Sequence, residues 1–187
     1  AEVIDLGIAR DDVDSLRAAL LRGLEADVLV TCGGISVGDH DLVLPTLLGL
    51  GGALVFRRVR LRPGRPTSFL MVPAPTGTRP VFALPGNPAS AHVAFELFVR
   101  PALRRMQGAG WERARRAVVL TAAAPCDPRR AHLIRARVVG DQATPLPDQT
   151  SGALRSIAGH NALVELPPGT CPMEPGASAM AILLDEP

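Results

Sequence analysis

The chain has 187 residues, 47% hydrophobic and 20% charged, so it can build a packed core and is not a disordered chain. A net charge of +2 and an aromatic content of 3% argue against nucleic-acid binding, and no apolar run approaches the roughly 18–20 residues of a membrane span. The widely spaced Cys32, Cys126 and Cys171 form no CxxC motif, which predicts reduced thiols in a cytoplasmic protein.

The first half of the sequence alternates between strand and helix patterns. The predicted strands cover residues 3–6 and 26–31, a stretch starting at 54, and residues 68–72 and 81–84. The predicted helices cover residues 11–24, 41–50 and 89–106. This order is typical of an α/β fold, an open, mostly parallel sheet with flanking helices, which we assign to residues 1–107. The chain starts at Ala1 within strand-like sequence, so we expect a piece of a longer protein.

From Trp111 onwards the pattern changes to short strands separated by Pro and Gly turns. These predicted strands cover residues 117–120, 132–138, 161–166 and 177–183. They predict a small β domain over residues 108–187, with the boundary near residues 107–110.

The first candidate site is Gly33-Gly34-Ile35-Ser36-Val37-Gly38-Asp39-His40-Asp41, which follows a predicted strand and precedes a helix. Open α/β sheets bind ligands at this edge, and glycines let backbone N–H groups approach an anion. Asp39 and Asp41 are hard oxygen donors that could hold Mg²⁺ together with substrate phosphates. The Gly-x-Ser-x-Gly hydrolase pattern also fits formally, but acids follow the serine and no oxyanion partner is found. A tight turn with a helix-capping aspartate remains the alternative.

The second candidate is a run of arginines. Residues 51–111 hold nine Arg against one Glu, whereas the preceding stretch is acidic. Strand alternation would place Arg58, Arg60 and Arg62 on one face, and the following Pro-Gly turn would bring Arg65 round to them. Guanidinium groups that face one way repel each other unless an anion lies between them, so the run predicts a phosphate or oxyanion site. Nucleic acid is the weaker alternative, since the run is short and aromatic residues are few.

The third candidate is Leu84-Pro85-Gly86-Asn87-Pro88, a turn between a predicted strand and a predicted helix. Its two prolines fix φ on both sides, which would present Asn87 and backbone groups at the same sheet edge. An ordinary turn is the alternative. The four histidines show no catalytic spacing, and we predict structural or surface roles for them.

Taken in order, these loops resemble those of the molybdopterin molybdenumtransferase family, which includes bacterial MoeA and the E domain of gephyrin. The family's usual forms are T-S-G-G-V-S-V-G-D-x-D, K-P-G-K-P and L-P-G-N-P-V-S. This chain has T-C-G-G-I-S-V-G-D-H-D, R-P-G-R-P and L-P-G-N-P-A-S. The resemblance spans nearly the whole chain, and the ordered set is highly specific. The departures are Cys32 for Ser and Arg for Lys at positions 58, 62 and 65; the chain contains no Lys at all, so compositional bias explains the second.

The resemblance also implies which residues act. Asp11, Asp39 and Asp41 match acids near the family's cleft and are the implied catalytic residues, with Asp41 the most important and Asp39 and Asp41 the implied Mg²⁺ ligands. The implied substrate-binding residues come from the three loops and, more weakly, from the C-terminal domain: Gly33, Gly34, Ser36, Gly38, Arg58, Arg62, Arg65, Pro85, Gly86, Asn87, Pro88, Arg130 and Ser151.

The implied activity is insertion of molybdenum from molybdate into adenylylated molybdopterin with release of AMP, supported by Mg²⁺. Residues 1–107 would be a molybdopterin-binding α/β domain without its first strand and helix, and residues 108–187 a C-terminal β-barrel-like domain. The full-length protein would be a homodimer with a small-molecule substrate, and molybdoenzymes or an adenylyltransferase are candidate partners. The alternatives are a non-catalytic molybdopterin-binding or scaffold fragment and a molybdopterin adenylyltransferase.

Overall fold

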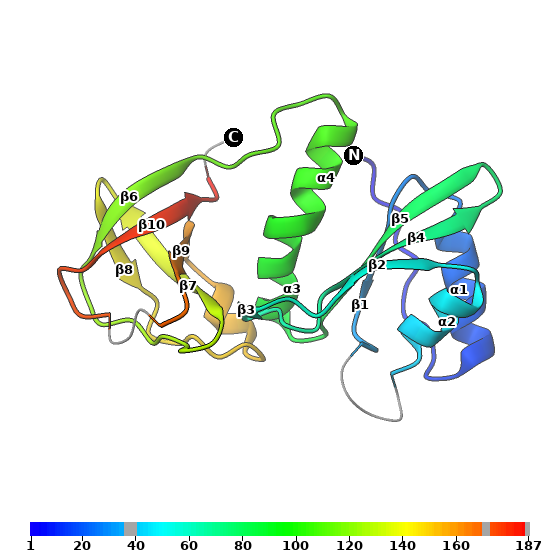
Figure 1. Cartoon of the computed structure of the whole chain (residues 1–187), viewed down its shortest axis with the longest axis horizontal. Helices are drawn as coiled ribbons and strands as arrows, with labels where there is room; N and C mark the ends of the chain where they lie inside the picture. The colour runs from blue at the N-terminus through cyan, green and yellow to red at the C-terminus, as the bar shows by residue number, and fades with distance from the viewer. Residues whose placement is uncertain (36–40, 170–172, 186–187) are drawn as a thin grey trace. The chain divides into compact units, whose positions relative to one another are not determined.

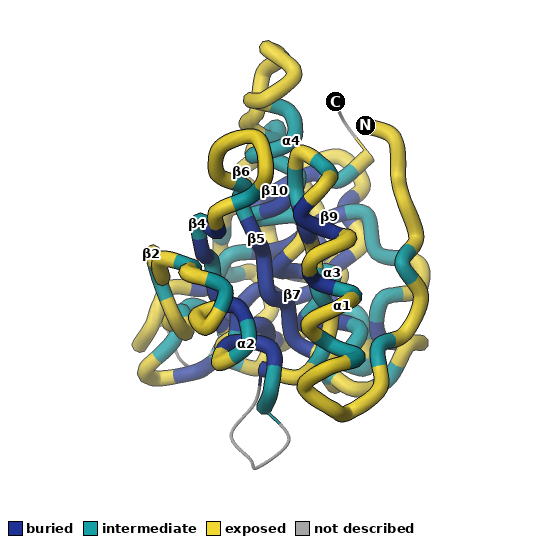
Figure 2. Tube along the Cα trace, turned by 90° about the vertical axis from the view of Figure 1, so that its right-hand side faces the viewer, coloured by how far each residue is buried: buried dark blue, intermediate teal, exposed yellow. Residues whose placement is uncertain are grey.

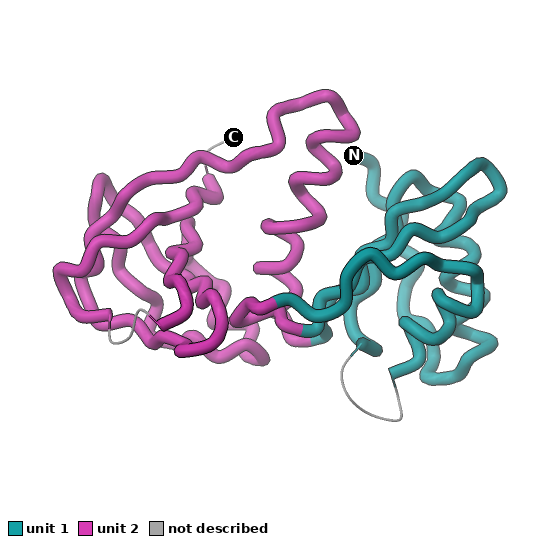
Figure 3. Tube along the Cα trace, in the orientation of Figure 1, with its two compact units in different colours: residues 1–59, 66–86 teal, residues 60–65, 87–187 magenta. Residues whose placement is uncertain are grey.

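The computed structural model of the chain describes residues 1–35, 41–169 and 173–185, and it divides into two compact units (Figure 3). Unit 1 comprises residues 1–59 and 66–86, and unit 2 comprises residues 60–65 and 87–187. The long helix after residue 87, which we predicted in the α/β domain, thus groups with the C-terminal strands. The division at residues 107 and 108 remains a prediction.

Unit 1 is built on a four-stranded sheet in the order β1-β5-β4-β2 (Figure 1). The strands are β1 (Leu29–Cys32), β2 (Ala53–Arg57), β4 (Ser68–Ala74) and β5 (Gly77–Leu84). The predicted α/β class is confirmed, but the sheet is mixed: β1 pairs with β5 in parallel, whereas β4 is antiparallel to both β5 and β2. The link between β4 and β5 is too short for the crossover that a parallel pair needs, which explains the difference.

Two helices, α1 (Val13–Gly23) and α2 (Val43–Gly49), pack with the unit 1 sheet around a shared apolar core. Asp12 caps α1 by accepting a hydrogen bond from the backbone N–H of Ser15 at 2.7 Å. Both helices agree with the predicted ones. The predicted strand over residues 3–6 is wrong: Val3 and Ile4 lie exposed, and no strand is described before residue 29. A strand needs a hydrogen-bonding neighbour, which the described part of unit 1 does not offer there.

Unit 2 contains a closed barrel of five strands. The sheet order is β3-β7-β8-β6-β10-β9, and β9 pairs back onto β7, which closes the barrel; β3 pairs in parallel with β7. The bounds are β3 (Leu61–Arg62), β6 (Arg115–Leu120), β7 (Ala131–Val139), β8 (Gln142–Pro145), β9 (Ala162–Leu166) and β10 (Ser178–Leu183). The predicted β domain is confirmed, although β8 and the short β3 were not predicted.

The barrel interior is filled mainly by aliphatic side chains and alanines. On β7 these are Ile134, Ala136 and Val138, so the even-numbered residues point inward and Arg135 lies on the outer side. Buried residues nevertheless run almost without a break along the first part of β7 (Figure 2), because loops outside the barrel cover it as well.

The remaining helices belong to unit 2. The helix predicted over residues 89–106 begins one residue earlier. It is continuous through α3 (Pro88–Ala94), a π-helical turn η1 (Phe95–Val99) and α4 (Arg100–Met106). The π turn comes just before Pro101, whose nitrogen cannot donate to the preceding turn. A 3₁₀ helix, η2 (Leu154–Ile157), lies in the loop between β8 and β9.

Cysteine pairing differs from the prediction. Cys32 is a free thiol, but Cys126 is disulfide-bonded, so the prediction of reduced thiols is wrong for Cys126. Linear spacing does not reveal which thiols the barrel loops bring together.

In the described ranges, no helix has the length and hydropathy to cross a membrane.

Candidate functional site

Two of the predicted loops meet at the carboxyl edge of the unit 1 sheet. Gly33 follows β1 and Gly86 follows β5, and the backbone N–H of Gly33 donates to the carbonyl of Leu84 at 2.9 Å. A Cβ added at Gly86 would lie 3.4 Å from the Cα of Gly33. An added Cβ at Gly86 would thus make an ordinary contact, whereas Gly33 has φ +97°, a conformation that favours glycine. The two glycines leave backbone without side chains at the edge where open sheets bind ligands.

Gly34 is required both by its backbone conformation and by its close contact with the start of α2. It has φ +64°, and an added Cβ would lie 2.7 Å from Cγ2 of Val43 at the start of α2. Its carbonyl accepts a hydrogen bond from the Val43 N–H at 3.3 Å. The glycine therefore lets the loop return directly into the helix. Ser36, Gly38 and Asp39 lie outside the described residues.

Asp41 occupies an unusual position just before α2. It is half-buried, and its Oδ1 is fully buried without a hydrogen-bond partner in the described part of the chain. Burial raises the pKa of the Asp41 carboxyl above its ordinary value, and the charges of Arg57 and Arg58 partly offset that rise. An unsatisfied buried carboxylate oxygen is costly, and a cation or a proton donor from a ligand would satisfy it.

Arg58 does not continue the strand that carries it. Its φ is +62°, and its N–H donates to the carbonyl of Thr67 at 3.0 Å. A long side chain in this conformation is rare and strained. The predicted alternation of Arg58, Arg60 and Arg62 on one strand face is therefore wrong: β2 ends at Arg57, and the chain changes units before Arg62.

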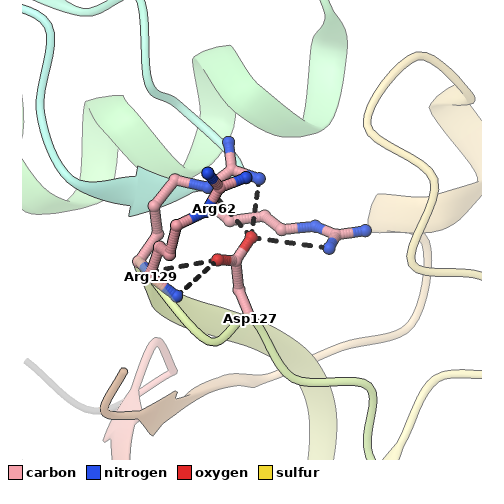
Figure 4. Close-up of polar contacts among 4 residues, drawn as sticks. Arg62, Asp127 and Arg129 are labelled. Atoms are coloured by element: carbon pink, nitrogen blue, oxygen red, sulfur yellow. Dashed lines mark hydrogen bonds and ion pairs between the residues drawn. The ribbon is translucent and has the colours of Figure 1, made fainter. Parts of the chain in front are cut away.

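In unit 2 a second group gathers around one carboxylate (Figure 4). Oδ2 of Asp127 accepts from Nε and Nη2 of Arg130 at 2.9 and 2.6 Å and lies 3.7 Å from Nη1 of Arg62. Oδ1 accepts the backbone N–H groups of Arg129 and Arg130, both at 3.0 Å. These hydrogen bonds hold the pKa of Asp127 well below its usual range. Two guanidinium groups thus share one charge, which leaves a positive excess suited to an anion.

His132 lies in the same part of unit 2 and is 1% exposed. Burial, followed by the charges of Arg62 and Arg135, lowers the pKa of His132 to about 4. Its Nδ1 is buried and has no partner among the described residues. The ring is therefore neutral at pH 7 and does not compete with the arginines for an anion.

The third group joins two predicted site residues that are far apart in sequence. Nδ2 of Asn87 donates to Oγ of Ser151 at 3.3 Å, and the N–H of Ala89 donates to the Ser151 carbonyl at 3.1 Å. Asn87 is the N-cap of α3, and Pro88 lies in the first turn of this helix. The loop from β8 to β9 is thereby docked on the start of α3.

Within unit 1, the structure brings Gly33 close to Gly86 and Asp41 near Arg58. Within unit 2, it brings Arg62 and Arg130 to one carboxylate and joins Asn87 to Ser151. Pro85 is buried and Arg65 is exposed in the turn after β3. Asp11 is exposed before α1, where Asp12 makes the capping bond.

Asp127 is the residue that sequence reasoning missed. The signal was present, because Asp-Pro-Arg-Arg is a sequence in which an aspartate readily accepts backbone N–H groups two and three residues on. No set of three or more His, Cys, Asp or Glu side chains gathers into a metal site within residues 1–35, 41–169 and 173–185.

Comparison with known families agrees with this geometry. Residues 1–105 match a family described as "Probable molybdopterin binding domain", and residues 117–184 match "MoeA C-terminal region (domain IV)". The two matches cover the α/β sheet with the long helix and then the barrel strands.

Named relatives point the same way. A molybdopterin molybdenumtransferase from Bacillus subtilis is 32% identical over 97% of this chain and 43% of its own length. Gephyrin from Dictyostelium discoideum is 37% identical over 56% of this chain and 16% of its own length. A solved structure titled molybdopterin biosynthesis moea protein, from Pyrococcus horikosii, has a TM-score of 0.80 at 29% identity, over 96% of this chain and 43% of its own. The chain spans less than half the length of these relatives.

Proposed function

Because this chain belongs to the MoeA/gephyrin family, we propose that it acts in molybdenum cofactor biosynthesis, inserting molybdenum from molybdate into adenylylated molybdopterin with release of AMP. The observation that carries the proposal is Asp41. Its Oδ1 is buried and has no partner among the described residues, it lies two residues before Val43, whose N–H bonds the Gly34 carbonyl, and Arg57 and Arg58 are near enough to influence its pKa.

The donor chemistry at Asp41 fits Mg²⁺. A hard cation takes carboxylate oxygens and commonly completes its shell with water and substrate phosphates, so one protein carboxylate can be enough to start the site. Asp39 is the second ligand that we propose. When bound, Mg²⁺ would neutralise charge on the phosphate of the leaving AMP.

The chain's own residues would bind and orient the substrate. In unit 1, the exposed Gly86 would offer backbone without a side chain to a phosphate. In unit 2, Arg62 and Arg130 would supply charge-assisted hydrogen bonds to an oxyanion. Asp127 holds both guanidinium groups so that they lose little conformational freedom on binding. Asn87 and Ser151 add uncharged polar contacts.

We also propose that the full-length protein is a cytoplasmic homodimer that binds molybdoenzymes or an adenylyltransferase. The family resemblance of the three loops supports this, and size-exclusion chromatography of the full-length protein tests the dimer.

The test is AMP release from adenylylated molybdopterin with molybdate and Mg²⁺, compared between the natural chain and Asp41→Asn. We expect molybdate-dependent release that the variant loses. Asp27→Asn is the matched control, since this exposed aspartate lies just before the start of β1, at the end of the strand away from the glycine loop. Binding of adenylylated molybdopterin without release would favour a binding fragment. Neither binding nor release would refute the proposal and favour a scaffold role, whereas a new adenylyl bond formed from ATP would indicate an adenylyltransferase.

A further inference from the structure

Several hydrogen bonds of the loop that carries Ser151 go to one barrel residue, Arg135. The N–H of Leu146 donates to the Arg135 carbonyl at 2.8 Å. Oε1 of Gln149 accepts from the Arg135 N–H at 3.1 Å, and its Nε2 donates back to the Arg135 carbonyl at 2.8 Å. Beyond Ser151, Nε of Arg135 donates to the Ser156 carbonyl at 2.8 Å. Contacts to Arg135 therefore bracket Ser151 on both sides.

Burying the Arg135 side chain costs more free energy than its one hydrogen bond to Ser156 would return. It is 0% exposed, and neither Nη1 nor Nη2 has a partner among the described residues. Ser156 Oγ is also buried and unpartnered. A buried guanidinium with unmet hydrogen bonds costs stability, and an apolar side chain on the outer face of β7 would avoid that cost.

What the guanidinium provides is a fixed anchor for η2. An aliphatic side chain could pack against this loop but could not bond the Ser156 carbonyl. On the C-terminal side of Ser151 the loop would still be tied to the barrel by Asn161, whose N–H donates to the Ala136 carbonyl at 3.1 Å, but η2 would have lost its bond to Arg135. The Asn87 to Ser151 hydrogen bond, at 3.3 Å, is long and depends on where the loop is held.

We propose that Arg135 is a positioning residue that acts through Ser151: it fixes residues 146–157 so that Ser151 meets Asn87 in a geometry ready to bind substrate. It does not itself contact the substrate. The proposal rests on the proposed function in taking Ser151 as a binding residue.

The test combines Arg135→Met, Ser151→Ala and the double variant in the intact chain. Met retains an unbranched apolar chain and removes the donor to Ser156. Hydrogen–deuterium exchange over residues 146–157 should rise in Arg135→Met but not in Arg137→Met, a control on the same strand and face whose side chain is exposed. Because it needs no ligand, this measurement is independent of the proposed function.

Binding of adenylylated molybdopterin then tests the coupling. We expect each single variant to bind about three- to tenfold more weakly, as for one lost hydrogen bond, and the double variant to bind no more weakly than Ser151→Ala. Losses that multiply in the double variant, or unchanged exchange in Arg135→Met, would overturn the proposal.

Two further results separate the explanations. If Arg135→Met does not fold, Gln149→Leu removes the clamp on the Arg135 backbone and should raise exchange in the same residues; unchanged exchange refutes the anchoring. Normal binding by Ser151→Ala would overturn the proposal that Arg135 acts through Ser151, while AMP release by the Asp41 variants would still decide the proposed function.

Discussion

His132 makes the folded chain sensitive to mild acid, and the size of the effect can be worked out. The ring is 1% exposed, and its pKa is lowered to about 4. The charges that face it are Arg62 from β3 and Arg135 from its own strand, which lower the pKa, and Asp127, which raises it together with a hydrogen bond to the Pro125 backbone.

The sign follows from proton uptake. A histidine in the unfolded chain has a pKa of about 6.5. Below that pH the unfolded state therefore binds a proton that the native ring, with its lower pKa, does not bind. Stability is therefore lost as the pH falls from about 6.5, and the loss levels off below about 4. With these two pKa values, the loss is about 2 kcal/mol at pH 5 and about 3 kcal/mol at the limit.

The perturbation that tests this is His132→Gln, which keeps an N–H donor and does not titrate. We expect the free energy of unfolding in urea to fall between pH 7.5 and pH 5.0 by about 2 kcal/mol less in the variant than in the natural chain. Burial also lowers the pKa values of His92 and His160, but both proteins share those groups, so the difference isolates His132. An identical pH dependence, or an NMR titration of His132 near pH 6.5, would refute the reasoning.

Three other substitutions test the site. Gly34→Ala forces a Cβ against Val43 at positive φ and should destabilise unit 1 by about 1–3 kcal/mol in thermal unfolding; full native stability would contradict the close contact. Arg58→Gly should raise stability by up to about 1 kcal/mol by removing the strained φ while weakening adenylylated molybdopterin binding, and Arg58→Ala should weaken binding without that gain. Arg130→Ala should weaken molybdate binding about tenfold in calorimetry, because the oxyanion loses one of its two guanidinium donors; unchanged binding would place the anion elsewhere.

Local rules explain why the elements could be predicted. The patterns that predicted α1, the long helix that starts with α3, and strands β5 and β7 depend on neighbours in sequence, and the structure agrees with each. The ordered loops were similarly sufficient to indicate the family. Predictions failed where the structure depends on which strand lies beside a segment. Residues 3–6 form no strand, and the unit 1 sheet is mixed rather than mostly parallel.

The sequence by itself determined the α/β and β halves, the positions of the glycine and proline turns, and the residue types able to bind an anion and a hard cation. Only the tertiary structure decided that Arg58 leaves the strand, that Asp127 gathers Arg62 and Arg130, and that Arg135 holds the loop carrying Ser151. The physical reason is that backbone preference acts over a few residues, whereas burial and hydrogen-bond satisfaction depend on segments brought together by the fold.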